Sequence, residues 1–132
     1  MRTGIPADRT AIEGLLEELY AARVAGQLEP LCALFSTDAR FRISGTSSGR
    51  PIAIAADGAS QIRPWLAMLL KTFKLANHEV LSKVIDGGAA AVHWRADIHS
   101  RITGSVIATE LVDLIEIGGG RITSYRELFV PY

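Results

Sequence analysis

Residues 89–117, AAAVHWRADIHSRITGSVIATELVDLIEI, decide the fold. Polar and apolar residues alternate along this stretch on both sides of Thr103-Gly104, which is the period of a β-strand interrupted by a turn. Further alternating stretches adjoin it across the glycine-containing links 86–88 and 118–120. Links this short join antiparallel strands, because a parallel crossover needs a dozen or more residues. The strands predicted in this way cover residues 77–85, 89–101, 105–117 and 121–130.

The first half of the chain has the apolar spacing of helices instead. One helix is predicted from five residues that share a helical face, and Gly26 suits its C-terminal end. A short helix follows around Pro30, then a strand over 40–44, an irregular loop beginning SGTSSGRP, and a third helix over 60–73. We therefore predict an α+β fold in which one curved antiparallel sheet forms a cone, with three helices on its concave face. The residues of the first helical face are Ile12, Leu15, Leu16, Leu19 and Tyr20.

Length and composition restrict the classes of protein that this chain can represent. Its 132 residues suit a single domain, residues 1–132, and 48% hydrophobic with 21% charged residues is a globular composition. Fourteen basic residues balance fourteen acidic ones, so no basic excess favours nucleic acid or an anionic membrane surface. There is no apolar run of membrane-spanning length and no secretory signal pattern, and the single cysteine excludes an intramolecular disulfide. We expect a cytoplasmic protein.

The alternation also sorts the side chains of each strand onto two faces. In 105–117 the face that carries Asp113 is the more apolar one, so we expect Asp113 on the core side, where an unpaired carboxylate is costly. The strand 89–101 permits two interpretations. Its charged face, which carries Arg95 and Asp97, could lie in solvent, with Trp94 in the core. Alternatively the charged face could line a pocket, and a second subunit would then cover the apolar face.

Two longer motifs resemble a known superfamily. The stretch AGQLEPLCALFSTDA, residues 25–39, and the ending GGGRITSYRELF, residues 118–129, are similar to motifs of the nuclear transport factor 2-like superfamily. Its members include ketosteroid isomerase, scytalone dehydratase, limonene-epoxide hydrolase and the SnoaL-like polyketide cyclases, and the resemblance covers nearly the whole chain. It implies the cone fold, whereas the reactions on this fold range over isomerisation, dehydration, hydrolysis and cyclisation.

The resemblance also implies candidate site residues. Arg95-Ala96-Asp97 is similar to the Arg-x-Asp element of limonene-epoxide hydrolase, and Glu127 falls at the position of its second acidic residue. Asp113 resembles the protonated aspartate of ketosteroid isomerase, an enzyme whose oxyanion hole consists of a tyrosine and such an aspartate. The resemblance implies an enzyme without a cofactor.

The resulting hypothesis is acid–base chemistry on a small apolar molecule: hydrolysis, isomerisation or cyclisation. Asp97 is the expected base, Arg95 its orienting partner, and Glu127 or Asp113 the proton donor. Two alternatives stay open, a ligand-binding module without chemistry and a scaffold with a filled cone. We expect no metal site, because the three histidines lack ligand spacing, and a homodimer formed through the sheet. The predicted pocket residues are Leu16, Tyr20, Trp65, His99, Ile115 and Tyr125.

Overall fold

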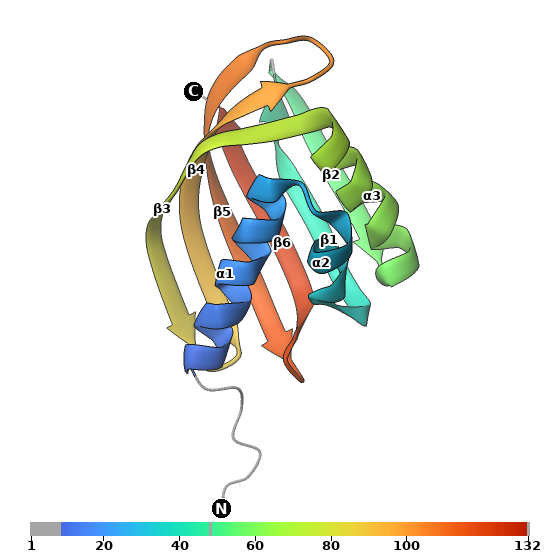
Figure 1. Cartoon of the computed structure of the whole chain (residues 1–132), viewed down its shortest axis with the longest axis vertical. Helices are drawn as coiled ribbons and strands as arrows, with labels where there is room; N and C mark the ends of the chain where they lie inside the picture. Colours follow the sequence, from blue (N-terminus) through green and yellow to red (C-terminus); the bar gives the residue numbers. More distant parts are fainter. Residues whose placement is uncertain (1–8, 48, 132) are drawn as a thin grey trace, which may run out of the picture.

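The computed structural model describes residues 9–47 and 49–131. Within them, three helices and a single six-stranded sheet confirm the predicted α+β class (Figure 1). The strand order in the sheet is β2-β1-β6-β5-β4-β3. The elements are α1 (Arg9–Ala25), α2 (Leu28–Ala33), β1 (Phe35–Ser47), β2 (Arg50–Asp57), α3 (Ala59–Thr72), β3 (Phe73–Asp86), β4 (Ala89–Ser100), β5 (Val106–Gly118) and β6 (Arg121–Pro131).

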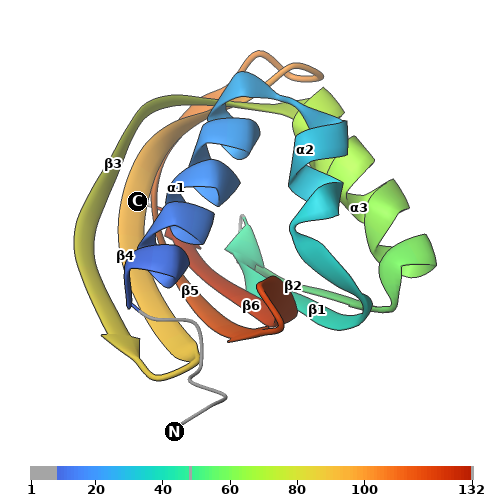
Figure 2. The ribbon, with the colours of Figure 1, turned by 60° about the horizontal axis from the view of Figure 1, so that its bottom comes forward.

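The sheet curves around the helices, which all lie on its concave side (Figure 2). Strands β3 to β6 form the predicted antiparallel meander. One pair departs from the prediction of an antiparallel sheet, because β1 runs parallel to β6, with Phe41 opposite Tyr125. These two strands are distant in sequence, so no short turn forces them to be antiparallel. The pairing closes the sheet over α2 and α3 and completes the cone.

The loop that was expected after residue 44 is a β-hairpin, so this expectation was wrong. Strand β1 continues to Ser47, and β2 pairs with it from Arg50 onward. A Cβ at Gly45 would lie 2.5 Å from the ring of Phe129, so the glycine here allows an aromatic ring of β6 to approach the backbone. Strand β2 lies at the edge of the sheet and is mostly exposed. An edge strand that carries a proline lacks the buried alternation by which sequence patterns are recognised.

The structure agrees with the first interpretation of β4, in which the charged face lies in solvent and Trp94 lies in the core. Trp94 is fully buried and Ala96 is 3% exposed, and both face the helices. Trp94 is paired with Leu111 of β5, another core residue on the concave face. Arg95 and Asp97 therefore lie on the convex face. The alternative in which a second subunit covers Trp94 was wrong, because α1 already buries that face within the same chain.

Helix α1 is the element that fills the cone from the side of β3 and β4 (Figures 1 and 2). It ends as predicted at Gly26, whose φ of 71° is a left-handed conformation that glycine adopts without strain. The N–H of Gln27 then donates to the carbonyl of Ala22 at 2.9 Å, which closes the last turn. Within the described residues, no helix is both long and apolar enough to cross a bilayer.

Candidate functional site: a buried pair of carboxyl groups

Two polar side chains of α1, Tyr20 and Arg23, reach the concave face of the sheet. They are three residues apart, so they lie on the same side of the helix, alongside its apolar stripe. Tyr20 is 6% exposed and the Arg23 side chain is 12% exposed. The same helical face that forms the core therefore also carries a phenol and a guanidinium group into it.

The sheet supplies the other side of the site from three neighbouring strands. Trp94 comes from β4, Asp113 from β5, and Tyr125 and Glu127 from β6. Asp113 lies directly opposite Glu127 in the antiparallel register, and Tyr125 shares their face because it is two residues before Glu127. Asp113 is fully buried and Glu127 is 3% exposed. Two carboxyl groups are thus held next to each other inside the cone.

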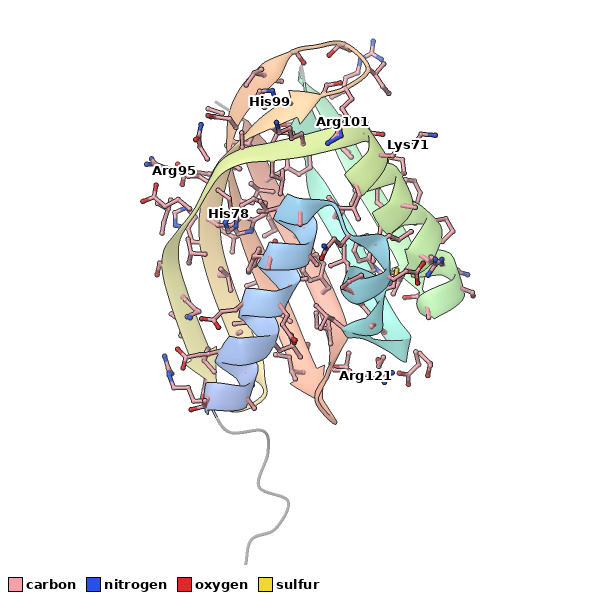
Figure 3. The ribbon with its side chains drawn as sticks, in the orientation of Figure 1. Lys71, His78, Arg95, His99, Arg101 and Arg121 are labelled. Atoms are coloured by element: carbon pink, nitrogen blue, oxygen red, sulfur yellow. The ribbon has the colours of Figure 1, made fainter. Side chains whose placement is uncertain are left out.

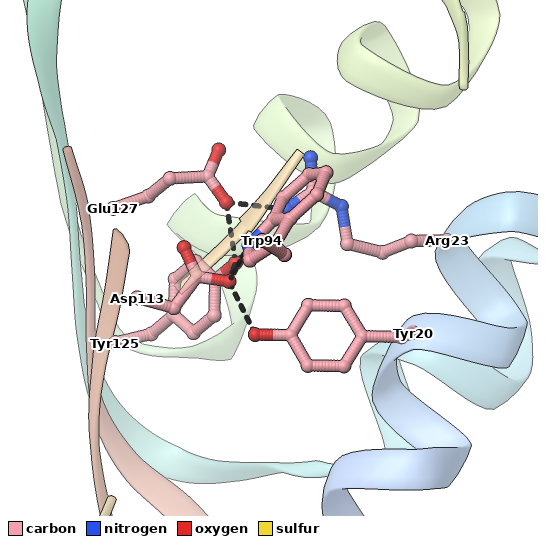
Figure 4. A network of polar contacts seen from close by, with 6 residues as sticks. All are labelled: Tyr20, Arg23, Trp94, Asp113, Tyr125 and Glu127. Carbon is pink, nitrogen blue, oxygen red and sulfur yellow. Dashed lines mark hydrogen bonds and ion pairs between the residues drawn. The ribbon is translucent and has the colours of Figure 1, made fainter. Parts of the chain in front are cut away.

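Asp113 is surrounded by hydrogen-bonding groups that converge on one of its oxygens (Figure 4). The Tyr20 hydroxyl donates to Oδ2 at 2.6 Å, and the indole N–H of Trp94 donates to the same atom at 2.8 Å. The Tyr125 hydroxyl oxygen lies 3.0 Å from it. The other oxygen, Oδ1, is buried and has no hydrogen-bond partner among the described residues.

Glu127 is held by a cation and a hydroxyl group. Arg23 Nη1 donates to Glu127 Oε2 at 2.5 Å, and the Tyr125 hydroxyl lies 2.7 Å from the same oxygen. Arg23 Nη1 also donates to the Tyr125 hydroxyl at 2.9 Å. The guanidinium group lies 5.2 Å from the centre of the Trp94 ring, at cation–π distance. Arg23 therefore fixes Glu127 and Tyr125 at the same time (Figure 4).

The surroundings drive the pKa values of the two carboxyl groups apart. Burial raises the pKa of Asp113 well above its ordinary value, and the negative charge of nearby Glu127 raises it further. Burial alone would also raise the pKa of Glu127, but the Arg23 charge and the hydrogen-bonding groups around Glu127 outweigh it and lower that pKa. The pKa of Arg23 is raised, chiefly by Glu127 and against the effect of burial. The site therefore combines a charged Arg23–Glu127 pair with an Asp113 that retains its proton well above the pH at which an aspartic acid ordinarily ionises.

A small cavity adjoins this network under the helices. Its volume is about 10 Å³, space for about one water molecule. Three polar residues, Arg23, Tyr125 and Glu127, line it together with apolar side chains from α1, α2, α3 and β1. The apolar lining residues are Leu19, Leu31, Phe35, Phe41, Ile43, Leu66 and Leu69. Asp113 is not part of the lining.

His78 lies beside the network at an irregularity of β3. Two residues, Asn77 and His78, lie between the paired positions Ala76 and Glu79, and Asn77 has a φ of 54°. Such a bulge redirects the next side chain, and the His78 ring stacks on Tyr20 with centroids 5.2 Å apart. Its buried Nε2 has no hydrogen-bond partner among the described residues. Burial and the Arg23 charge lower its pKa, so the imidazole is neutral.

The structure brings together only part of the expected site. Asp113 and Glu127 are neighbours, and the predicted pocket residues Tyr20 and Tyr125 join them. Leu16 and Ile115 are buried in the core on the same side of the sheet, while Trp65 of α3 is 37% exposed. Among the described residues, side chains from all three helices and all six strands contribute to this core.

The expected convergence of Arg95 and Asp97 with these carboxyl groups was wrong. Arg95 Nη2 pairs with Glu79 at 2.7 Å, and Asp97 accepts a hydrogen bond from Asn77 at 2.8 Å, both on the convex face. Figure 3 shows Arg95 projecting away from the helices. His99 lies further along β4 on the same face as Asp97. The physical reason is the period of two, which places these residues opposite Trp94 and Ala96.

Sequence reasoning missed Arg23, the cation that the carboxyl pair requires. Its signal was present, since a charged residue three positions after Tyr20 continues the apolar face of α1. Trp94 was considered only as a core or interface residue, although a buried indole N–H needs an acceptor. Among the described residues, no group of three or more His, Cys, Asp or Glu side chains is arranged to hold a metal ion.

The protein is a small cone-shaped α+β domain with a buried pair of carboxyl groups inside it. The sequence identifies its family. The sequence model of the SnoaL-like domain matches residues 16–125. The chain belongs to the SnoaL-like domain family, and it has the fold of nuclear transport factor 2-like proteins. No curated protein shows significant sequence similarity to the chain.

Solved structures with the same fold are distant in sequence. A proposed isomerase from Rhodopseudomonas palustris superposes with a TM-score of 0.76 at 17% identity, over 90% of this chain and 88% of that one. A nuclear transport factor 2-like protein from Burkholderia xenovorans LB400 gives 0.76 at 18% identity, over 93% and 92%. An LEH-like epoxide hydrolase of M. tuberculosis gives 0.72 at 15% identity, over 92% and 84%. At such identities the likeness establishes the fold and leaves the reaction open.

Proposed function

We propose that the protein is a cofactor-independent enzyme that performs acid–base chemistry on a small, mostly apolar molecule inside the cone. The observation that carries the proposal is the pair Asp113 and Glu127, whose pKa values are shifted in opposite directions by their surroundings. One carboxyl group that keeps its proton beside one that is ionised supplies the acid and the base that hydrolysis, isomerisation or cyclisation requires. Perturbed pairs of this kind are enriched at functional sites.

The lining of the cavity supports the assignment of roles. Glu127 lines the cavity as a carboxylate, so it is the proposed base, and the Tyr125 hydroxyl beside it is the proposed hydrogen-bond donor to the ligand. Apart from Arg23, the remaining walls are apolar, which favours a ligand with few polar groups. A volume of about 10 Å³ is too small for such a ligand. Leu66 and Leu69 of α3 would have to move away from the sheet for binding.

Replacing Glu127 by glutamine should lower turnover by about 100-fold or more, because the amide keeps the shape of the side chain and removes the base. The assay would follow small epoxides, enones and lactones, and the wild-type pH–rate profile should be bell-shaped. Asp97→Asn on the convex face is the matched control and should retain wild-type turnover. Full activity in Glu127→Gln, or its loss in Asp97→Asn, would contradict the proposed base.

The small cavity favours a second candidate, a scaffold with a filled cone, beside which a ligand-binding module without chemistry stays an alternative. The Arg23–Glu127 ion pair and the tight packing are also what a structural network requires. Titration with apolar alcohols and ketones, followed by the fluorescence of Trp94 in a Trp65→Phe background, separates the possibilities. Saturable binding without turnover would support the module, and no binding would support the scaffold.

We also propose that the protein is a cytoplasmic homodimer that associates through the convex face of the sheet. Leu114 and Leu128 are each 39% exposed there, and Val130 is 65% exposed, so association would remove apolar surface from water. Light scattering at micromolar concentration should give the dimer mass. Leu128→Arg should give a monomer, while Val24→Arg on the exposed side of α1 should not. A monomeric wild-type protein would contradict the proposal.

A further inference from the structure

The Tyr125 hydroxyl carries a single proton, which restricts the direction of the hydrogen bonds around it. The Tyr125 hydroxyl has three polar neighbours: Arg23 Nη1 at 2.9 Å, Asp113 Oδ2 at 3.0 Å and Glu127 Oε2 at 2.7 Å. A tyrosine hydroxyl carries one proton, and a guanidinium group can only donate. Tyr125 can therefore donate to only one of the two carboxyl groups.

One assignment gives an acceptor to each proton in the contacts around Asp113 and Tyr125. Tyr125 donates to the ionised Glu127, the nearer of the two carboxyl groups, and Asp113 donates its own proton from Oδ2 to the Tyr125 oxygen. Tyr20 and Trp94 donate to Asp113 Oδ2, and Arg23 donates to both Tyr125 and Glu127. Among the oxygens of Asp113, Tyr125 and Tyr20, the buried one left without a partner is then Asp113 Oδ1, an acceptor. An unfilled acceptor is tolerated better in a protein interior than an unpaired donor.

We propose that Tyr125 relays a proton between the two carboxyl groups. The O–H bond of Asp113 breaks as the Tyr125 oxygen takes its proton, and the proton that Tyr125 held passes to Glu127 Oε2. One proton moves along each of the two hydrogen bonds, and the negative charge moves from Glu127 to Asp113. No further reactant is needed, and the reverse shift restores the starting state. Arg23 beside Glu127 favours the charge on Glu127, so the shifted state is the minor one.

The relay gives the buried Asp113 a use that its position would otherwise prevent. Asp113 is fully buried and does not line the cavity, whereas Tyr125 and Glu127 do. Through the relay, Glu127 presents a carboxylate in one state and a carboxyl group in the other. The role of this exchange in turnover rests on the proposed function, but the relay itself is a property of the resting protein.

In the shifted state Tyr125 holds the proton that came from Asp113, and Tyr125 lines the cavity, so this proton can be replaced there by a deuteron before the reverse shift. The reverse shift then returns the deuteron to Asp113. The test is the rate at which the Asp113 proton exchanges with deuterium by this route.

Infrared spectroscopy follows the carboxyl C=O band that Asp113→Asn abolishes, after dilution of the protein into D2O. Tyr125→Phe removes the relay and leaves the ring in place, so exchange then requires local opening and should be slower by roughly tenfold or more. Tyr20→Phe is the matched control, because it also removes a hydroxyl group from Asp113 but does not contact Glu127. It should shift the band and leave the exchange rate close to that of the wild type.

Unchanged exchange in Tyr125→Phe, or equal slowing in both variants, would overturn the relay. So would the absence of a protonated Asp113 band in the wild-type protein at neutral pH. If Tyr125→Phe does not fold, Glu127→Gln tests the same path from its other end and should also slow the exchange. Slowed exchange in a protein that turns over none of the assayed compounds would support the relay and contradict the proposed enzyme, so the two failures are distinguishable.

Discussion

Replacing Arg23 by methionine should lower the free energy of unfolding by about 3–5 kcal/mol at neutral pH. Methionine keeps much of the apolar length of arginine but removes the only side chain that forms an ion pair with Glu127 among the described residues. Glu127 is 3% exposed, so water cannot solvate the charge that is left behind. Urea denaturation of the wild type and the variant gives the difference in free energy.

Two further variants show whether the buried charge causes the loss. Arg95→Met breaks an ion pair with Glu79 in which both side chains are about half exposed, and such pairs contribute about 0–1 kcal/mol. The double variant Arg23→Met/Glu127→Gln removes both charges and should recover a large part of the stability. Equal losses in Arg23→Met and Arg95→Met, or no recovery in the double variant, would mean that Glu127 is not a buried unpaired charge in Arg23→Met.

The stability of the wild-type protein should fall as the pH rises above the acid range, through the titration of Asp113. Its pKa is near 3.8 in an unfolded chain and well above that in the folded protein. Between these two values the folded state holds a proton that the unfolded state has lost, so raising the pH favours unfolding by up to about 1.4 kcal/mol per pH unit. Glu127 acts in the opposite direction, because its lowered pKa stabilises the fold above pH 4.5 and this contribution is lost in acid.

Asp113→Asn isolates this effect, because the amide cannot ionise and still offers an oxygen to Tyr20 and Trp94. Relative to the wild type, the variant should therefore gain stability steadily as the pH rises from 5 toward the folded pKa of Asp113, at up to about 1.4 kcal/mol per pH unit. Asp97→Asn, on the convex face, should follow the wild-type curve. Parallel curves for Asp113→Asn and the wild type would mean that Asp113 ionises in the folded protein as it does in the unfolded chain.

Both predictions involve contacts between residues that are far apart in the chain. Arg23 and Glu127 are separated by 104 positions, and Tyr20 and Asp113 by 93. Local sequence patterns identify Tyr20 and Asp113 as members of apolar faces. Which polar groups meet across those faces depends on how α1 crosses the sheet and on the register of β5 with β6, and neither is a local property.

The sequence by itself determined the class of the fold and the antiparallel meander β3 to β6, which forms most of the cone. Alternation over residues 89–117 and the glycine turns around it are local signals, and short links leave antiparallel pairing as the remaining choice. They also placed Asp113 on the core side, because the opposite face of β5 carries Glu110 and Glu116. A buried strand and a short turn depend on near neighbours, which is why a single sequence predicts them.

Only the tertiary structure decided which carboxyl groups share a site. The alternation in β4 defines two faces but does not say which of them α1 covers, and this choice separates Arg95 and Asp97 from Asp113 and Glu127. The edge strand β2 was not predicted either. Its residues are mostly exposed and lack the apolar alternation of a buried strand, and its hydrogen bonds come from pairing with β1. A strand pattern fixes the relative orientation of its side chains, whereas burial depends on what packs against each face. The cation of this site, Arg23, was therefore identified only once α1 lay across the sheet.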